Sequence, residues 1–380
     1  MANKIDLTDK AGPGGKKDIL RWKGYHDDRL YTGPSVVYLH LTNFCNFKCR
    51  FCWYHSKDCK EGIKEKKSID RAVFEKIILD CRSMNTMSVL FSGEGEPLLH
   101  PQINSLIESV YKTGMGLMIN TNGALIGNIS PLVLRHVSNL NINISEVGNR
   151  AYLSMQSGRN KSFDKIIESC RYITLIREKY SKPRLGIVFI INRHNLRHMS
   201  NALDLAVALK ADSLRFKLAS VNKDTKHIAV TRPFLNDLKY ETMMLLKTRK
   251  SRVLKTNIVS FADSLLKAKF FDECEDVYFK YGYFRSFYFE KYFKPGSRCP
   301  YGWFFALIDI RGNVFLCCNH QQFIVGNVLK DSFVDIWNSK TAQQVRLKMK
   351  YDFNIKDKLW RECHYCGRDG FFNPAEGLHD

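Results

Sequence analysis

Short apolar runs alternate with amphipathic stretches along residues 36–218, and this alternation constrains the fold more than any other feature. The runs fit six strands, at 35–42, 87–92, 116–123, 141–145, 184–191 and 212–218. Helical stretches occupy all five intervals between these strands, at 68–84, 101–114, 130–139, 162–180 and 195–210. Strands that alternate with helices form a parallel sheet with right-handed crossovers, so the sequence predicts an α/β fold. Ligands of such folds bind at the carboxyl ends of the strands.

Two of the expected helices carry signals at their ends. Ser68 is a candidate N-cap for the first helix. In the second, Pro101 suits a first turn and Gly114 suits a C-terminal cap.

Charge and cysteine content narrow the classes of protein. Lys and Arg outnumber Asp and Glu by 59 to 38, which favours anionic partners, although lysines spread over helices would also give a solvated basic surface. We find no apolar signal segment and no stretch long enough to cross a bilayer, and we therefore expect a cytoplasmic protein with no membrane partner. In that compartment the 12 cysteines are expected to be reduced thiols for metal binding or catalysis.

Cys45, Cys49 and Cys52 directly follow the first expected strand, in the stretch CNFKCRFC. This spacing can aim three thiolates at three corners of one cluster, one ligand short of closing it. The open corner could bind a substrate or cofactor. Lys48 and Arg50 would favour thiolate over thiol. The alternatives are a zinc site, three unconnected buried cysteines, or a redox pair that leaves Cys45 unused.

The same stretch resembles the C-x3-C-x2-C signature of radical S-adenosylmethionine (SAM) enzymes, including Phe51 before the last cysteine. The resemblance extends over residues 36–218 and implies a partial (β/α)6 barrel. It also implies a [4Fe-4S] cluster on Cys45, Cys49 and Cys52, with SAM at the open iron. Cleavage of SAM in this family gives a 5′-deoxyadenosyl radical that abstracts hydrogen from an unactivated carbon.

The stretch FSGEGEPLLHP at 91–101 resembles the glycine-glycine-glutamate motif of this family. Gly95, Glu96 and Pro97 match, whereas Glu94 replaces the first glycine. The motif holds the amino group of the methionine part of SAM in the family. The resemblance therefore implies a cofactor contact from Glu96 or its adjacent backbone.

Two further stretches look like the ends of the family's third and fourth strands. Asn122 lies in NTNG, and Ser145 and Glu146 lie in NISEVG. The resemblance implies that these three residues line the cofactor site, with Ser145 and Glu146 near the ribose hydroxyls.

A second cysteine set, Cys299, Cys317, Cys363 and Cys366, could hold a closed four-ligand site. Gly312, five residues before Cys317, resembles an element of the twitch and SPASM extensions of radical SAM enzymes. We expect Cys317 rather than its neighbour Cys318 to bind, because adjacent strand residues point to opposite faces. The shorter twitch fits better and implies one auxiliary [4Fe-4S] cluster, with zinc as the alternative.

The predicted organisation has four parts. They are an N-terminal extension at 1–34, the radical SAM partial barrel at 35–218, a helical and aromatic connector or lid at 219–298, and a hairpin-plus-helix auxiliary cluster domain at 299–380. The helix of the last part is expected at 332–349.

A closed auxiliary cluster favours electron relay, and so the oxidation of a polar small molecule such as a sugar, a cyclitol or a nucleotide-linked compound. Arg215 and Lys217 are catalytic candidates that could instead hold an anionic substrate, and His194 or Glu146 could act as base. We expect an electron donor such as flavodoxin or ferredoxin and no nucleic acid partner.

Four alternatives remain open. They are a peptide or protein maturation enzyme, an epimerase with Cys318 as hydrogen donor, an RNA-modifying enzyme that uses the aromatic stretch 277–293, and a zinc-stabilised binding module.

Overall fold

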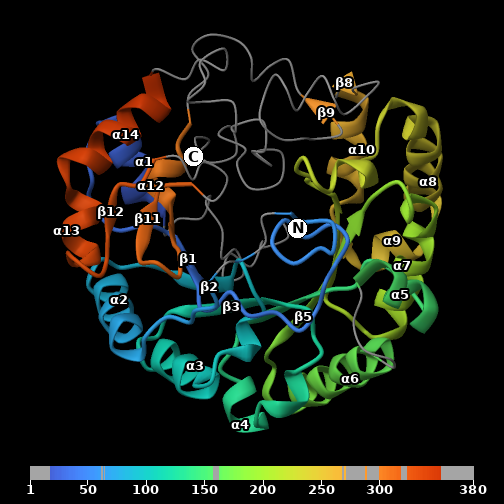
Figure 1. The fold of residues 1–380 in the computed structure, drawn as a ribbon, viewed down its shortest axis with the longest axis horizontal. Coiled ribbons are helices and arrows are strands. Elements are labelled where there is room, and N and C mark those ends of the chain that lie inside the picture. Colours follow the sequence, from blue (N-terminus) through green and yellow to red (C-terminus); the bar gives the residue numbers. More distant parts are fainter. Residues whose placement is uncertain are drawn as a thin grey trace, which may run out of the picture.

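The computed structural model describes residues 18–60, 63, 65–156, 162–267, 269–270, 287–288, 299–317 and 323–351. Its main feature is a ten-stranded sheet in the order β12-β11-β10-β1-β2-β3-β4-β5-β6-β7. Strands β1 to β7 are parallel to their neighbours, which confirms the α/β prediction. Figure 1 shows this sheet curving inside a ring of helices, as in a partial barrel.

The six expected barrel strands are all present. They are β1 (Val36–His40), β2 (Ser88–Ser92), β3 (Gly116–Thr121), β4 (Asn139–Asn143), β5 (Arg184–Ile191) and β6 (Ser213–Leu218). The helices between them are α2 (Arg71–Ser83), α3 (Ile103–Lys112), α4 (Pro131–Leu134), α5 (Asn149–Gln156), α6 (Ser162–Tyr180) and α7 (Met199–Ala208). The strands and helices of the structure therefore alternate in the order that the sequence predicts.

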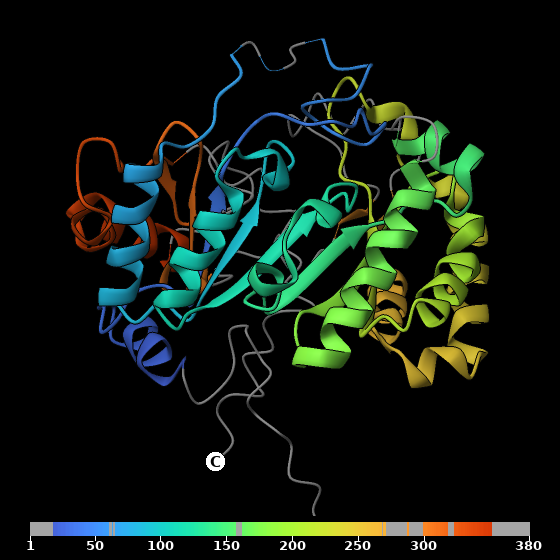
Figure 2. The ribbon, with the colours of Figure 1, turned by 90° about the horizontal axis from the view of Figure 1, so that it is seen from below.

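Each barrel strand presents two different faces. The outward residues, such as Leu39, Phe91 and Ile119, are fully buried in the main core against the helices. Inward residues of β1 and β2 form a separate apolar cluster, which includes Val36 and Leu90, together with Phe305, Leu307 and Phe315 from the C-terminal part of the chain. Figure 2 shows the segment after β1 crossing over the opposite, carboxyl edge of the sheet.

The cap of α2 differs from the sequence prediction. Asp70, rather than Ser68, is the N-cap, and its carboxylate accepts hydrogen bonds from the N–H groups of Ala72 and Val73. Ser68 instead donates its hydroxyl hydrogen to Thr42 (2.8 Å) and pairs with it in a short bridge that ties the chain beside the end of β1. Gly114 does follow α3 and has a φ of +76°, as a C-terminal cap requires.

The described part of residues 219–298 contains helices and short strands. Their described elements are α8 (Leu235–Lys247), α9 (Lys250–Val253), β7 (Lys255–Thr256), α10 (Ile258–Lys267), β8 (Lys269–Phe270) and β9 (Phe287–Tyr288). Strand β7 pairs with β6 and extends the barrel sheet. Along the described part of the chain, no helix combines the length and apolar character needed to cross a bilayer.

The expected C-terminal hairpin is continuous with the barrel. Its elements are β10 (Phe305–Ile308), β11 (Asn313–Phe315) and β12 (Gly326–Asn327), preceded by α12 (Tyr301–Phe304). Strand β10 pairs in parallel with β1, so the hairpin extends the same sheet. The expected helix 332–349 is two helices, α13 (Phe333–Asn338) and α14 (Lys340–Tyr351), because Ser339 has an extended conformation. The helix α1 (Ile19–His26) packs against α12.

Candidate active site

The loop that contains Cys45, Cys49 and Cys52 begins five residues after β1 ends, at the carboxyl edge of the sheet. None of the three thiols is in a disulfide. Backbone N–H groups approach two of them, from Phe47 to Cys45 Sγ (3.5 Å) and from His55 to Cys52 Sγ (3.3 Å). Such contacts stabilise negative charge on sulfur.

Burial raises the pKa of all three thiols, and that of Cys45 to about 12. The charges of Cys45 and Cys52 would also destabilise a thiolate on Cys49, so the three sulfurs lie close enough to interact. A cation among the thiols, such as the iron of a cluster, would favour their thiolate forms. In the described residues, no three His, Cys, Asp or Glu side chains converge as ligands of a single ion. Cluster cysteines differ from such ligands because each binds a separate iron.

The loop between β2 and the short 3-10 helix Pro97–Leu99 packs directly on the cysteine loop. The N–H of Glu96 donates to the carbonyl of Phe44 (2.8 Å). A Cβ on Gly95 would lie 2.3 Å from that same carbonyl oxygen, closer than real Cβ atoms come to any heavy atom. Glycine is thus required here by the close approach of two backbones.

The Glu96 carboxylate points into the protein. It accepts hydrogen bonds from the Thr121 hydroxyl (2.6 Å) and from the N–H groups of Asn122 (2.7 Å) and Leu98 (3.1 Å). Burial raises the pKa of Glu96 more than these hydrogen bonds lower it. The carboxylate therefore links the end of β3 to the loop after β2. Because its oxygens already accept these hydrogen bonds, a cofactor contact of this loop is expected from the backbone of 94–97.

Asn122 faces the cysteine loop. Its Nδ2 donates to Asn46 Oδ1 (2.7 Å), and its Oδ1 accepts from the N–H of Ala124 (3.0 Å). The structure thus brings the third strand end beside the loop of Cys45, as the cofactor-site prediction requires.

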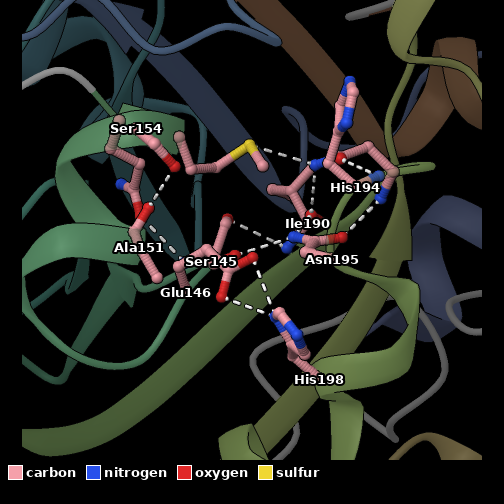
Figure 3. Close-up of polar contacts among 11 residues, drawn as sticks. Ser145, Glu146, Ala151, Ser154, Ile190, His194, Asn195 and His198 are labelled. Carbon is pink, nitrogen blue, oxygen red and sulfur yellow. Dashed lines mark hydrogen bonds and ion pairs between the residues drawn. The ribbon is translucent and has the colours of Figure 1, made fainter.

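Ser145 and Glu146 follow β4 and lie among residues from α5, β5 and the turn after β5 (Figure 3). The Ser145 hydroxyl donates to Asn143 (2.7 Å) and accepts from the N–H of Ile190 (3.2 Å), and the residue is fully buried. The Glu146 carboxylate pairs with His198 Nδ1 (2.9 Å), which the sequence analysis did not identify. Ribose contacts from Ser145 and Glu146 remain predictions, and Glu146 would make its contact while paired with His198.

A row of amide side chains crosses the inner face of the sheet. Asn141 Nδ2 donates to Asn120 Oδ1 (3.0 Å), and Asn120 Nδ2 donates to Ser92 Oγ (3.1 Å). Asn120 and Asn141 are register partners on β3 and β4. The sequence analysis missed this amide row, although the alternation NLNIN in β4 places every asparagine of that strand on one face.

Arg215 and Lys217 lie on the same face of β6, with Leu214 and Phe216 buried on the opposite face. Arg215 is half-buried and Lys217 is exposed. Burial lowers the pKa of Arg215. His194 follows β5, and both partial burial and the positive charge of Arg50 lower its pKa, which favours the neutral imidazole that a base needs.

The auxiliary cysteines lie toward the other end of the barrel strands. Cys317 is two residues beyond Phe315, whose partner is Leu307 on β10, and β11 runs antiparallel to β10. The chain therefore reaches Cys317 near the amino ends of β10 and β1. Buried Cys299 comes just before α12, and its N–H donates to Met349 (3.0 Å). Cys318, Cys363 and Cys366 lie outside the described residues.

Family models match both halves of this arrangement. A model of the radical SAM superfamily matches residues 39–206, and a model of an iron-sulfur cluster-binding domain, SPASM, matches residues 299–367. The chain is a radical SAM enzyme with a SPASM domain. The enzyme accordingly uses SAM and a [4Fe-4S] cluster, with auxiliary iron-sulfur binding in the C-terminal domain.

Relatives of the enzyme have diverse activities. A tungsten-containing aldehyde ferredoxin oxidoreductase cofactor-modifying protein of Pyrococcus furiosus is 24% identical over 47% of this chain and 50% of its own length. Fe-coproporphyrin III synthase of Methanosarcina barkeri is 29% identical over 45% and 40%, respectively. A SAM-dependent nucleotide dehydratase of Selenomonas ruminantium is 24% identical over 48% and 66%. The match thus spans about half of these relatives.

Solved structures share the fold over more of the chain. SuiB of Streptococcus suis with bound SAM has a TM-score of 0.60 at 15% identity, covering 83% of this chain and 68% of SuiB. The protein anSMEcpe with bound SAM has a TM-score of 0.55 at 16% identity, covering 87% and 89%. These likenesses confirm the partial barrel and its small C-terminal domain.

Proposed function

We propose that the enzyme oxidises a polar small molecule by hydrogen abstraction at a carbon that bears a hydroxyl group. The substrate loses one hydrogen atom to the 5′-deoxyadenosyl radical, a proton to a base and an electron to the auxiliary cluster, which leaves a ketone. The class of substrate is a sugar, a cyclitol or a nucleotide-linked compound.

The placement of Cys45, Cys49 and Cys52 opposite the described auxiliary cysteines, Cys299 and Cys317, carries this proposal. Cys45, Cys49 and Cys52 lie beyond the carboxyl end of β1, whereas the chain reaches Cys317 near the amino end of the same strand. At ~3.3 Å per residue, this strand and the loop beyond it separate the two levels by roughly 15–20 Å. A substrate on the inner face would lie between the site of hydrogen abstraction and the site that accepts the electron.

The inner face itself suits hydroxyl groups. The amide row of Ser92, Asn120 and Asn141 offers both donors and acceptors, and no side chain of the row is charged. Arg215 and Lys217 on β6 would add positive charge for a phosphate. The similarity to a nucleotide dehydratase supports a phosphorylated or nucleotide-linked substrate.

His194 is the base that this proposal favours. It lies at the carboxyl edge of β5, and its lowered pKa leaves the imidazole neutral at neutral pH. Lys217 on the neighbouring strand could hold the substrate oxygen during proton loss.

The test is turnover by the reconstituted enzyme with pools of sugar phosphates and nucleotide sugars in heavy water. We expect 5′-deoxyadenosine and a ketone in equal amounts, with no solvent deuterium on carbon. A product at the oxidation level of its substrate that carries deuterium on carbon would instead identify an epimerase. A redox-neutral product that has lost water would indicate a dehydratase.

Peptide maturation is the second candidate. The observation that favours it is the same amide row, because side-chain amides also pair with peptide groups. A structure of SuiB bound to its precursor peptide SuiA shares the fold, with a TM-score of 0.61 at 15% identity. Formation of 5′-deoxyadenosine that depends on an added peptide, and on no small molecule of the pools, would replace the first proposal with this one.

A further inference from the structure

Glu94 is unusual in its position between two glycines that make close contacts. Gly93 has a φ of +129°, and a Cβ there would lie 2.2 Å from the His40 ring, while Gly95 abuts the backbone before Cys45. The Glu94 side chain is only 5% exposed, although its position is a glycine in the family motif. A buried carboxylate needs compensating partners.

Its main partner comes from the SPASM domain. Arg311 lies in the turn between β10 and β11, and its Nη2 donates to Glu94 Oε1 (3.1 Å). His40 Nδ1 lies 3.7 Å from the same oxygen. Burial raises the pKa of Glu94, but His40 and Arg311 outweigh it, and the pKa is lowered overall.

Arg311 is itself held in place by its own turn. Its Nε donates to Asp309 Oδ2 (3.2 Å), and its N–H donates to Asp309 Oδ1 (2.8 Å). Asp309 is buried and also accepts from Asn313 (3.0 Å). The guanidinium therefore reaches Glu94 from a fixed turn, even though the Arg311 side chain is 58% exposed.

The contact continues from Glu94 to the cysteine loop. His55 Nε2 donates to the main-chain oxygen of Glu94 (2.8 Å), and the N–H of His55 points at Cys52 Sγ (3.3 Å). One residue thus joins the turn of the SPASM hairpin to the loop of the cluster cysteines.

We propose that Glu94 and Arg311 form a positioning pair, through which the docked SPASM hairpin holds the loop 93–96 in the conformation that binds the methionine part of SAM. His40 belongs to β1 itself, whereas Arg311 reaches the carboxylate only when the hairpin is docked on β1. A glycine at position 94 would leave this loop independent of the hairpin. In this enzyme, SAM affinity therefore depends on the auxiliary domain.

The test uses reconstituted full-length enzyme and SAM itself as the probe. Glu94→Gln, Arg311→Met and the double variant are compared by calorimetric titration of SAM, and by the change that SAM causes in the electron paramagnetic resonance spectrum of the reduced cluster. Arg197→Met is the matched control, because Arg197 makes an exposed ion pair with Asp237 (2.7 Å) outside this network. Iron content and Tm are measured for every variant.

We expect each single variant to bind SAM about tenfold more weakly, which corresponds to ~1.4 kcal/mol. The double variant should lose no more SAM affinity than either single variant, because each of the three variants removes the same Glu94–Arg311 contact. The spectral change on SAM addition should shrink at unchanged iron content. SAM affinity of Arg311→Met within twofold of that of Arg197→Met, or a loss that only follows loss of iron, would overturn the proposal.

Discussion

The two cysteine sets of this enzyme are positioned in different ways. Cys45, Cys49 and Cys52 share one short loop after one strand, so their relative placement is largely local. Cys299 and Cys317 lie on either side of α12 and β10, and their placement depends on how the hairpin docks on β1. The difference teaches that one loop largely fixes the spacing of the three predicted cluster ligands, whereas the placement of Cys299 and Cys317 depends on tertiary packing.

Replacing one cysteine in each set should have clearly different effects on SAM cleavage. Cys49→Ser should abolish 5′-deoxyadenosine formation and lower iron by about four per chain, since one [4Fe-4S] cluster is lost. Cys299→Ser should lose a similar amount of iron but still cleave SAM. Iron, sulfide and 5′-deoxyadenosine assays check both variants. Loss of SAM cleavage in Cys299→Ser at full occupancy of the first cluster would contradict the separation.

Weakening the packing of the SPASM domain should release iron from the dispersed cysteine set before it releases iron from the loop of Cys45, Cys49 and Cys52. Arg346 on α14 is fully buried, and it donates to the carbonyls of Gly302 and Trp337 (both 2.8 Å). Arg346→Met leaves these carbonyls unpaired and should lower the free energy of unfolding by about 2–4 kcal/mol.

Denaturant unfolding and iron content measure this effect, with exposed Arg71→Met on α2 as the control. The iron that Arg346→Met loses should be auxiliary iron. Equal loss from both clusters would show that the two sites do not differ in this way.

A change in the loop after β2 should affect only the local set. Gly95→Ala would place a methyl group against the backbone before Cys45 and force the two loops apart, at a cost of about 1–3 kcal/mol. We expect SAM binding ten- to a hundredfold weaker by calorimetry, with auxiliary iron retained. Gly127→Ala is the control, because a Cβ there meets nothing within 4 Å.

The smallest effect is expected between the two sites, in the amide row. Asn141→Leu keeps the size of the side chain but removes the hydrogen bond to Asn120, so substrate-dependent 5′-deoxyadenosine formation should fall about tenfold in kcat/KM. SAM affinity should not change. Asn338→Leu, on the surface of α13, is the control. Unchanged kcat/KM would show that the amide row does not contact substrate.

Local signals in the sequence predicted most of the fold. Strand 184–191 and helix 162–180 have the predicted bounds, because apolar periodicity determines both. The choice of Ser68 over Asp70 as N-cap failed because both are good caps, and the pairing of Ser68 with Thr42 is a tertiary contact. The break at Ser339 does have a local signal that the sequence analysis missed, because the Ser339 hydroxyl accepts a hydrogen bond from the N–H of Ala342 (3.1 Å) as the N-cap of α14.

The sequence predicted those parts of the candidate site that depend on residues close together in the chain. The spacing of Cys45, Cys49 and Cys52 and the motif that contains Gly95 are both local patterns, and the structure adds the close approach of two backbones that requires glycine at position 95. The inward direction of the Glu96 carboxylate, the His198 partner of Glu146 and the contact of Glu94 with Arg311 depend on residues far apart in the chain. No periodicity in the sequence reveals such pairs.

The parallel pairing of β10 with β1 also affects how this chain can be made. Val36 emerges from the ribosome before its partner Phe305, which is synthesised only after all the other barrel strands. Until then one side of VVYLH is an unpaired edge, with apolar residues on both faces, of the kind that associates with other chains. Closing so long a loop is also slow. Strand β10 thus covers the exposed edge of β1 once the C-terminal part of the chain has been synthesised. We therefore expect chains truncated before residue 299 to aggregate and not to fold into a smaller active barrel.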